Sequence, residues 1–331
     1  MTNAIATLSD RRLFFLGVNT GFVTEGRPDQ RYLDFYSSRS SPDLHCAIVG
    51  NVVVPGGHGS NTVTPALTTE SVWADLAASI RAAGSLPGIQ LATTWNGYIG
   101  LRKFVTAESR EFIARARQIV SEMKPERVAA VLDSFDVAAD IAVRHGFDHI
   151  QIHAAHGYLL SLLVDHRINR EATGVFERLT LLAERLRDAS VETSIRVSLK
   201  TGDSDFDGDG TSDFLDRIAR LPFDYVDLSS GFYNIDKRLI YPARPDFLAA
   251  RLDESLAVGL RHPERSFILS GRALNHDWAG LPSNMHPGLC RDLIANPRFL
   301  QEPRDGCQNH NKCHYYSRGE SHLTCARWAV R

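Results

Sequence analysis

Two histidines and a tyrosine follow a short apolar run in HIQIHAAHGY, where His153 and His156 stand three residues apart and Tyr158 two residues further on. Two imidazole N–H groups can donate together to one carbonyl or nitro oxygen and stabilise negative charge that develops there. A phenol is protonated at neutral pH and can deliver a proton to a neighbouring carbon. The segment therefore predicts the reduction of an activated C=C bond. The spacing equally fits a structural role, in which His153 ends a strand and Tyr158 packs on a helix.

The elements that must position this segment alternate along the chain between short apolar runs and amphipathic stretches. The predicted strands are residues 12–18, 46–54, 88–94, 149–153, 194–198, 224–229, 266–270 and 285–290. Eight such βα units predict a TIM (β/α)8 barrel, in one domain over residues 1–331. No G-x-G-x-x-G follows a strand, which argues against an open dinucleotide-binding sheet.

Two of the helices between these strands carry clear boundary signals. One is predicted to begin at Thr68 or Thr69 and to stop at Gly84. The other is predicted over DSFDVAADIAVRHG, from Asp133 or Ser134 to Gly146. Reacting groups of such barrels sit at the C-terminal ends of the strands. His153 ends the fourth predicted strand, so we expect His153, His156 and Tyr158 to face the barrel mouth.

Composition limits the class of protein. The 331 residues are 43% hydrophobic and 23% charged, with a net charge of −2. These values are typical of a soluble globular protein and indicate no bulk attraction to nucleic acid or to an anionic membrane. We expect a cytoplasmic protein, because the first residues lack a secretion signal, no stretch is long enough to span a membrane, and the five scattered cysteines make no disulfide framework.

HAAHGYLL resembles the H-x-A-[HN]-G-Y-L signature of the Old Yellow Enzyme family of FMN-dependent oxidoreductases, and INREATG resembles the N-x-R-x-D-x-Y-G-G segment that follows it. The likeness covers nearly the whole chain and implies FMN as cofactor and NAD(P)H as co-substrate. The positions that it implies for flavin contacts are Asn19, Thr20, Gly50, Gln90, Arg196, Gly271 and Arg291.

Among these positions, the resemblance implies that Gln90 meets the pyrimidine edge and Arg196 lies beside N1 and O2 of the flavin, while Gly271 and Arg291 meet the phosphate. The sequence departs from the family at two places. The histidine that usually follows the glutamine strand is missing, and Cys290 stands where the family usually has glycine. Without the resemblance, Arg196 fits a buried ion pair and Arg291 a surface helix equally well.

Two further constellations resemble metal sites. Asp205, Asp207, Asp209 and Asp216 have the spacing of a calcium loop, although Ser212 or Asp213 could instead cap a helix there. Segment 305–331 is rich in cysteine and histidine, and its candidate ligands are Cys307, His310, Cys313 and Cys325. They resemble the cluster motif of the dienoyl-CoA reductase and trimethylamine dehydrogenase branch. Ordinary thiols, a zinc site, and an iron–sulfur cluster served by a separate electron-transfer protein are all open.

The leading hypothesis is an ene-reductase-like enzyme in which His153 and His156 hold the acceptor oxygen and Tyr158 protonates carbon. One alternative is a flavin-dependent desaturase or dehydrogenase, for example of an amine, with another electron acceptor. A second, from another class, is a non-catalytic, metal-stabilised barrel that binds a ligand. The expected partner is a small-molecule substrate, and the resemblance adds a homo-oligomer, because self-association is frequent in the family.

Overall fold

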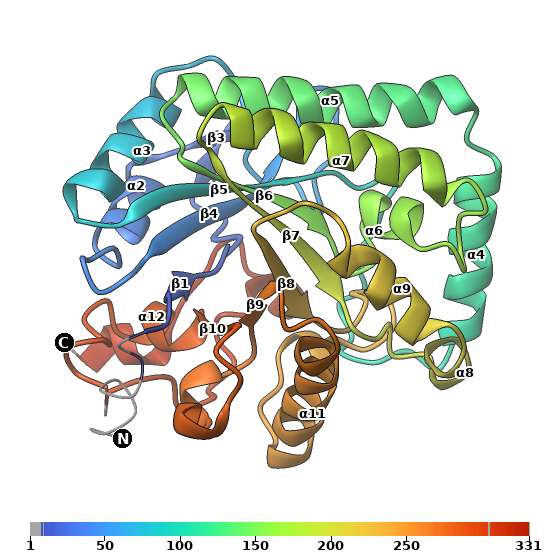
Figure 1. Cartoon of the computed structure of the whole chain (residues 1–331). Helices are drawn as coiled ribbons and strands as arrows, with labels where there is room; N and C mark the ends of the chain where they lie inside the picture. Colours follow the sequence, from blue (N-terminus) through green and yellow to red (C-terminus); the bar gives the residue numbers. More distant parts are fainter. Residues whose placement is uncertain (1–7, 9, 304, 331) are drawn as a thin grey trace.

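Eight parallel strands close into a barrel in the computed structural model, which describes residues 8, 10–303 and 305–330 (Figure 1). Around the barrel the strands follow the order β1-β10-β9-β8-β7-β6-β5-β4. Their bounds are β1 Phe14–Phe15, β4 Cys46–Val53, β5 Leu86–Ala92, β6 His149–Ala154, β7 Glu192–Ser198, β8 Tyr225–Ser229, β9 Ser266–Leu269 and β10 Met285–Leu289. The predicted TIM barrel and each of its eight strands are confirmed.

The first strand closes the barrel although it is only two residues long. Phe14 pairs with Gly288 of β10 on one side and with Cys46 of β4 on the other. The strand is shorter than the predicted 12–18 because the chain beyond Phe15 turns into the barrel mouth. A small antiparallel hairpin, β2 Val23–Thr24 and β3 Arg27–Pro28, lies outside the barrel and was not predicted.

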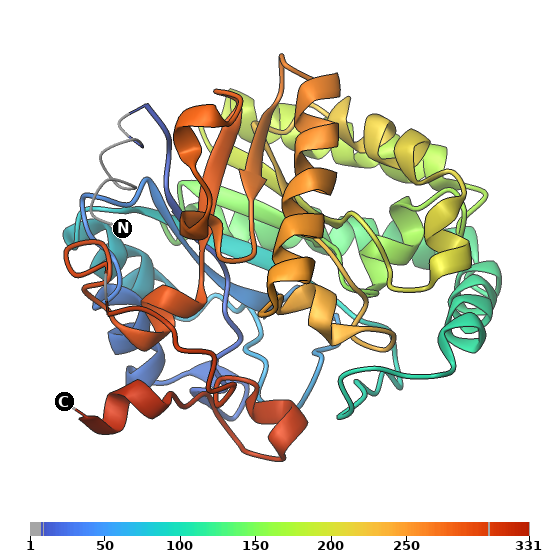
Figure 2. The ribbon, with the colours of Figure 1, turned by 90° about the horizontal axis from the view of Figure 1, so that it is seen from below.

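Helices cover the outside of the barrel, and Figures 1 and 2 show α5, α7, α9 and α11 ranged around it. The α-helices are α2 Gln30–Ser37, α3 Val72–Ala82, α4 Ser109–Ser121, α5 Pro125–Arg144, α6 Leu159–Val164, α7 Ala172–Asp188, α8 Ser204–Gly208, α9 Thr211–Ala219, α10 Lys237–Ile240, α11 Pro245–Arg261, α12 Arg291–Ala295 and α13 Tyr315–Arg318. Short 3-10 turns span Ala273–Asn275, Trp278–Gly280 and Ala326–Val330. Of the helices in the described part of the chain, none has both the length and the apolar character needed to cross a bilayer.

The predicted C-terminal ends of two helices agree with the structure, whereas their predicted starts do not. Helix α3 stops at Gly84, whose φ of 98° is the left-handed conformation that favours glycine at a helix end. Its N-cap is Ser71 rather than Thr68 or Thr69. Helix α5 begins at Pro125, because proline suits a first helical turn, and Asp133 and Ser134 lie inside it.

The core has an inner and an outer layer because side chains alternate along each strand. Phe15 points outward, where its ring lies 5.6 Å from that of Tyr36 on α2. Phe14 points into the barrel, where its ring lies 5.0 Å from that of Tyr225. The outer layer contains fully buried large side chains such as Trp73 of α3 and Phe135 of α5. Each such side chain contributes roughly 2–3 kcal/mol of burial free energy.

A polar network fills the end of the barrel opposite the mouth. His149 Nδ1 and His45 Nε2 lie 2.7 Å and 2.9 Å from the Glu192 carboxylate. His149 Nε2 also lies 2.7 Å from the hydroxyl of Ser194. Burial alone would raise the pKa of Glu192, but the hydrogen bonds from the two histidines outweigh it and hold the pKa far below its ordinary value. The carboxylate therefore ties β4, β6 and β7 together at this end.

Replacing Glu192 by glutamine should lower the free energy of unfolding by about 1–3 kcal/mol at neutral pH, because the two imidazoles lose a charged acceptor. The folded-state pKa lies below the unfolded value of about 4.5, so this stabilisation is complete above that value and is lost as the pH falls further. Urea unfolding at a series of pH values should give a flatter acid limb for the variant. Glu184→Gln, an exposed change on α7, is the control; an equal effect of both would contradict the assignment.

Candidate active site

A large cavity opens at the mouth of the barrel, where the C-terminal ends of the strands meet. The empty space in and above this cavity is about 1440 Å³, which includes open solvent. Its walls come from β4, β5, β6, β7 and β10, from the segments after β1, β4, β5, β6, β8, β9 and β10, and from the C-terminal segment that contains α13. The tail is bound across the mouth, because Leu323 N donates to Thr20 O at 2.7 Å and Tyr316 Oη to Gly100 O at 3.0 Å.

The cavity brings together most of the residues that the sequence singled out. Those that line it are Asn19, Gln90, His153, His156, Tyr158, Arg196, Gly271 and Arg291. Thr20 and Gly50 lie outside the lining. Thr20 is fully buried and accepts a hydrogen bond from Phe22 N, and the backbone N–H of Gly50 donates to Tyr36 Oη at 3.1 Å. Both therefore support the wall from behind.

His153 presents one free N–H to the cavity. Its Nδ1 lies 3.2 Å from the backbone N–H of Ala155 and therefore accepts that hydrogen bond. Burial, together with the nearby Arg196 guanidinium, holds the pKa of His153 well below its ordinary value, so the ring is neutral at physiological pH. A neutral ring that accepts at Nδ1 carries its proton on Nε2. His153 is thus a fixed, uncharged donor.

His156 presents the second donor. Its Nε2 lies 2.7 Å from Ser229 Oγ, and that oxygen already accepts a hydrogen bond from Arg196. With the serine hydroxyl as the donor to Nε2, the proton of the neutral imidazole lies on Nδ1. Nδ1 is buried and has no partner. Burial, followed by the charges of His153 and Arg196, holds the pKa of His156 well below its usual value.

Tyr158 stands beside the two imidazoles. Its ring centroid lies 4.7 Å from that of His153, and the centroids of His153 and His156 are 5.0 Å apart. Its hydroxyl accepts a long hydrogen bond from Asn51 Nδ2 at 3.4 Å. Burial raises the pKa of Tyr158 well above its ordinary value, so the phenol keeps its proton at every physiological pH. Two neutral donors and one proton source thus share a wall.

A buried chain of polar side chains holds the floor of the cavity. Asp227 is fully buried on β8 and pairs with Arg196 Nη1 at 2.6 Å. Gln151 donates to the same Asp227 oxygen at 3.2 Å, and Gln90 Nε2 donates to Gln151 Oε1 at 2.5 Å. Arg196 is therefore both a member of a buried ion pair and a cavity residue. The chain fixes Gln90 and Arg196 toward the space above them.

The segments after β9 and β10 form a second, cationic wall. Gly271 has a φ of 90°, and a Cβ there would lie 3.0 Å from Pro242 Cγ, so only glycine fits without strain. Arg291 Nη2 donates to Pro242 O, and Nη1 lies 3.4 Å from Asn309 Oδ1. Cys290 has a φ of −148°, so its backbone does not require the glycine usual in the family. This wall suits a phosphate.

These residues fit the flavin mononucleotide that the resemblance implies. Gln90 offers an amide for the edge of a pyrimidine, and Arg196 offers a guanidinium held in place by Asp227. Arg291 and the backbone at Gly271 form the cationic wall for a phosphate. All four residues line the same cavity, so their polar groups face one ligand space.

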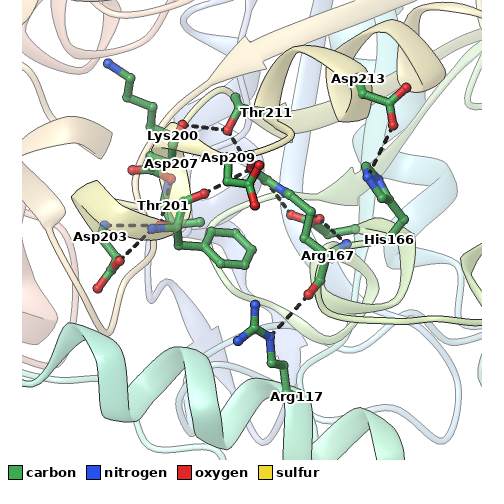
Figure 3. Close-up of polar contacts among 12 residues, drawn as sticks. Arg117, His166, Arg167, Lys200, Thr201, Asp203, Asp207, Asp209, Thr211 and Asp213 are labelled. Carbon is green, nitrogen blue, oxygen red and sulfur yellow. Dashed lines mark hydrogen bonds and ion pairs between the residues drawn. The ribbon is translucent and has the colours of Figure 1, made fainter.

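The acidic loop after β7 does not form the calcium site that its spacing suggested. Figure 3 shows Asp207 turned back on its own loop, where its carboxylate accepts from Thr201 N at 2.7 Å and Gly202 N at 2.8 Å. Asp205 pairs with Arg110, and Asp216 accepts from Arg261 Nε at 3.0 Å. Helix α9 starts after Gly210 rather than at Ser212 or Asp213. The carboxylates of Asp205, Asp207 and Asp216 thus serve separate contacts, and Asp209 accepts from Arg167 through its backbone carbonyl.

The structure does not support the predicted metal ligands of the tail, Cys307, His310, Cys313 and Cys325. His310 is exposed, and its Nε2 lies 3.2 Å from Gln308 Oε1. Cys313 instead lines the mouth cavity. Nowhere in residues 8, 10–303 and 305–330 do three or more histidine, cysteine or acidic side chains lie where they could hold a metal ion. The zinc and iron–sulfur interpretations are therefore withdrawn.

Sequence reasoning missed several side chains that shape the cavity. They are Asn51, Lys237, Tyr241, His314 and Tyr316. Lys237 in DKRLIYP and His314 in CHYYS carried no spacing signal, because their neighbours in the cavity are distant in sequence.

Comparisons with known proteins agree with this geometry. The profile of the NADH:flavin oxidoreductase / NADH oxidase family matches residues 20–173. An NADPH dehydrogenase of Bacillus velezensis is 27% identical over 84% of this chain and 84% of its own length. An NADH-dependent flavin oxidoreductase of Hypocrea jecorina is 23% identical over 52% of this chain, which spans 44% of that relative. An NADH oxidase of Thermoanaerobacter brockii is 24% identical over 87% of this chain, which spans 48% of that relative.

Two solved structures share the fold. A 2-naphthoyl-CoA reductase in complex with 2-naphthoyl-CoA superimposes with a TM-score of 0.70 at 14% identity, over 96% of this chain and 54% of its own. An Old Yellow Enzyme from Pichia sp. AKU4542 superimposes with a TM-score of 0.62 at 16% identity, over 89% of this chain and 83% of its own. At these identities the likeness establishes the barrel architecture.

Replacing Asp227 by asparagine should lower the free energy of unfolding by about 3–5 kcal/mol, because Arg196 would be left as a buried charge without its counterion. Urea unfolding of the purified protein measures this. Ser229→Ala, which removes a neutral hydroxyl that bonds both Arg196 and His156, should cost less, about 1–2 kcal/mol. The double variant Asp227→Leu, Arg196→Met should regain part of the loss; a further loss would contradict the pairing.

Proposed function

We propose that this chain is a flavin oxidoreductase of Old Yellow Enzyme type, and that it reduces an activated C=C bond of a small molecule with FMN and NAD(P)H. The observation that carries this proposal is the wall formed by His153, His156 and Tyr158. It holds two uncharged N–H donors beside a phenol that keeps its proton. The similarity to known flavin oxidoreductases favours an enzyme over a non-catalytic ligand-binding barrel.

The two imidazoles bind the acceptor. His153 Nε2–H and His156 Nδ1–H would donate to the same carbonyl or nitro oxygen, since their rings stand at 83° with centroids 5.0 Å apart. Both donors are fixed by hydrogen bonds to Ala155 and Ser229, so little reorganisation is needed when negative charge develops on that oxygen. Because the rings are neutral, their tautomers stay the same over the physiological pH range.

Bound FMN would supply the hydride, received from NAD(P)H, that is added to the β-carbon. Tyr158 would then give its phenolic proton to the α-carbon, so that one hydride and one proton saturate the bond. The burial that raises the pKa of the phenol keeps it protonated before the step. Arg196 and Arg291, with the amide of Gln90, would hold the flavin ring and phosphate, and Asn19 and Gly271 complete that set.

Tyr158→Phe should slow reduction of an enone by about 10²-fold or more, because the proton source is removed while the ring shape is kept. Stopped-flow measurement separates this step from reduction of the flavin by NADPH, which should change little. Tyr98→Phe is the matched control, since Tyr98 lies on the same cavity with its ring 5.8 Å from that of Tyr158. Equal loss in both half-reactions, or a larger effect of Tyr98→Phe, would refute the role of Tyr158.

A further inference from the structure

Lys237 is a buried cation in the wall of the cavity. It begins α10 and is 2% exposed. Its Nζ donates to Leu101 O and, at 3.0 Å, to Ser317 Oγ. The ammonium also lies 5.9 Å from the ring centroid of Tyr316. Leu101, Tyr316 and Ser317 all line the cavity, so the charged end of Lys237 sits among lining residues rather than in the protein interior.

This ammonium has no counterion in the described part of the chain. The carboxylate beside it in sequence, Asp236, pairs with Arg238 instead. Burial lowers the pKa of Lys237 to about 8, and no neighbouring carboxylate raises it again. An ammonium has three N–H donors, and its two protein acceptors here are a carbonyl and a hydroxyl. Such a group is costly to bury unless a ligand completes its charge and hydrogen bonds.

Aromatic side chains line the cavity that Lys237 shares with His153, His156 and Tyr158. The ring of Tyr233 lies 5.7 Å from that of Tyr158, and its hydroxyl lies 3.1 Å from that of Tyr241. The ring of Tyr241 in turn lies 4.2 Å from that of His314 in the tail. A flat, unsaturated molecule suits such walls. One end of it would meet the two imidazoles, and an anionic end would meet the ammonium.

The proposed phosphate wall uses different partners. Arg291 binds Pro242 O and Asn309, whereas Lys237 binds residues 101 and 317, so the two cations share no hydrogen-bond partner. His314 lies near both, since burial and then the charges of Arg291 and Lys237 lower its pKa to about 4. A cofactor phosphate is therefore the competing source of the anion, and the experiment must separate the two.

We propose that Lys237, together with Ser317, binds a carboxylate on the acceptor, so that the substrate is a flat unsaturated carbonyl compound with a carboxylate at the end remote from the reduced bond. The inference rests on the proposed function, because it places the reduced bond beside Tyr158. It adds the substrate class: an anionic acceptor rather than a neutral one.

The test compares a matched pair of acceptors, 4-(3-oxobut-1-enyl)benzoate and its methyl ester, with the FMN-loaded enzyme. We expect the wild type to prefer the carboxylate in kcat/KM, and Lys237→Met to reduce that preference roughly 10- to 100-fold, the range typical of a hydrogen bond to a charged group. Lys103→Met, an exposed change in the neighbouring loop, controls for the general loss of one positive charge and should leave the preference intact.

A second readout does not depend on turnover. Calorimetric titration of the holoenzyme with the saturated acid 4-(3-oxobutyl)benzoate should show binding that Lys237→Met weakens by a similar factor. Lys237→Gln, which keeps donors for Leu101 and Ser317 without the charge, should show the same loss if the methionine variant is not recovered in folded form. Weakened binding of the acid in either variant supports the carboxylate site.

Three outcomes would overturn the inference. The variants could keep the wild-type preference and affinity for the acid. They could lose FMN, or lose discrimination between NADPH and NADH, with the preference for the acid unchanged, which would assign Lys237 to a cofactor phosphate. Lys103→Met could match Lys237→Met. Failure of the proposed function looks different: the wild type would bind the saturated acid through Lys237 and reduce neither the benzoate nor its ester.

Discussion

The buried pair between Asp227 and Arg196 is the interaction on which the cavity depends. A buried carboxylate in the middle of a barrel is costly without a cation and hydrogen-bond donors. Arg196 and Gln151 both donate to Oδ2 of Asp227, whereas Oδ1 is buried without a partner among the described residues. The same pair sets the positions above it. Arg196 donates to Ser229, whose hydroxyl lies 2.7 Å from His156 Nε2, and the carboxylate positions Gln90 through Gln151. The buried ion pair thus orients Arg196 and Gln90 in the floor of the cavity.

Burial then sets the protonation states that the chemistry uses. It keeps His153 and His156 neutral and Tyr158 protonated, so donors and proton source are ready without any titration near neutral pH. The opposite end of the barrel shows the contrasting solution. There the imidazoles of His45 and His149 surround Glu192 and favour its charged form. The mouth leaves donors free for a ligand, whereas the closed end pairs them within the protein.

The sequence predicted the barrel and the HAAHGY wall because both depend on local signals. Strand periodicity fixes the βα units, and strand alternation with a short following turn places His153, His156 and Tyr158 on one wall. Two predictions were wrong where the residue types suit a metal site but the side chains do not come together. Asp207 binds the backbone of its own loop, Asp205 and Asp216 pair with arginines of other helices, and His310 contacts Gln308, because spacing along a chain does not fix where side chains point. Lys237 was missed since its partners, Leu101 and Ser317, are far away in sequence.

In the proposed reaction, a flavin bound in the mouth of this barrel passes electrons to an activated double bond. The most direct measurement is the visible absorption spectrum of the protein loaded with FMN under anaerobic conditions, recorded after addition of NADPH and again after addition of an enone. We expect the flavin band to bleach with NADPH and to return with the enone. A protein that cannot retain FMN, or a bleached flavin that no enone reoxidises, would contradict it.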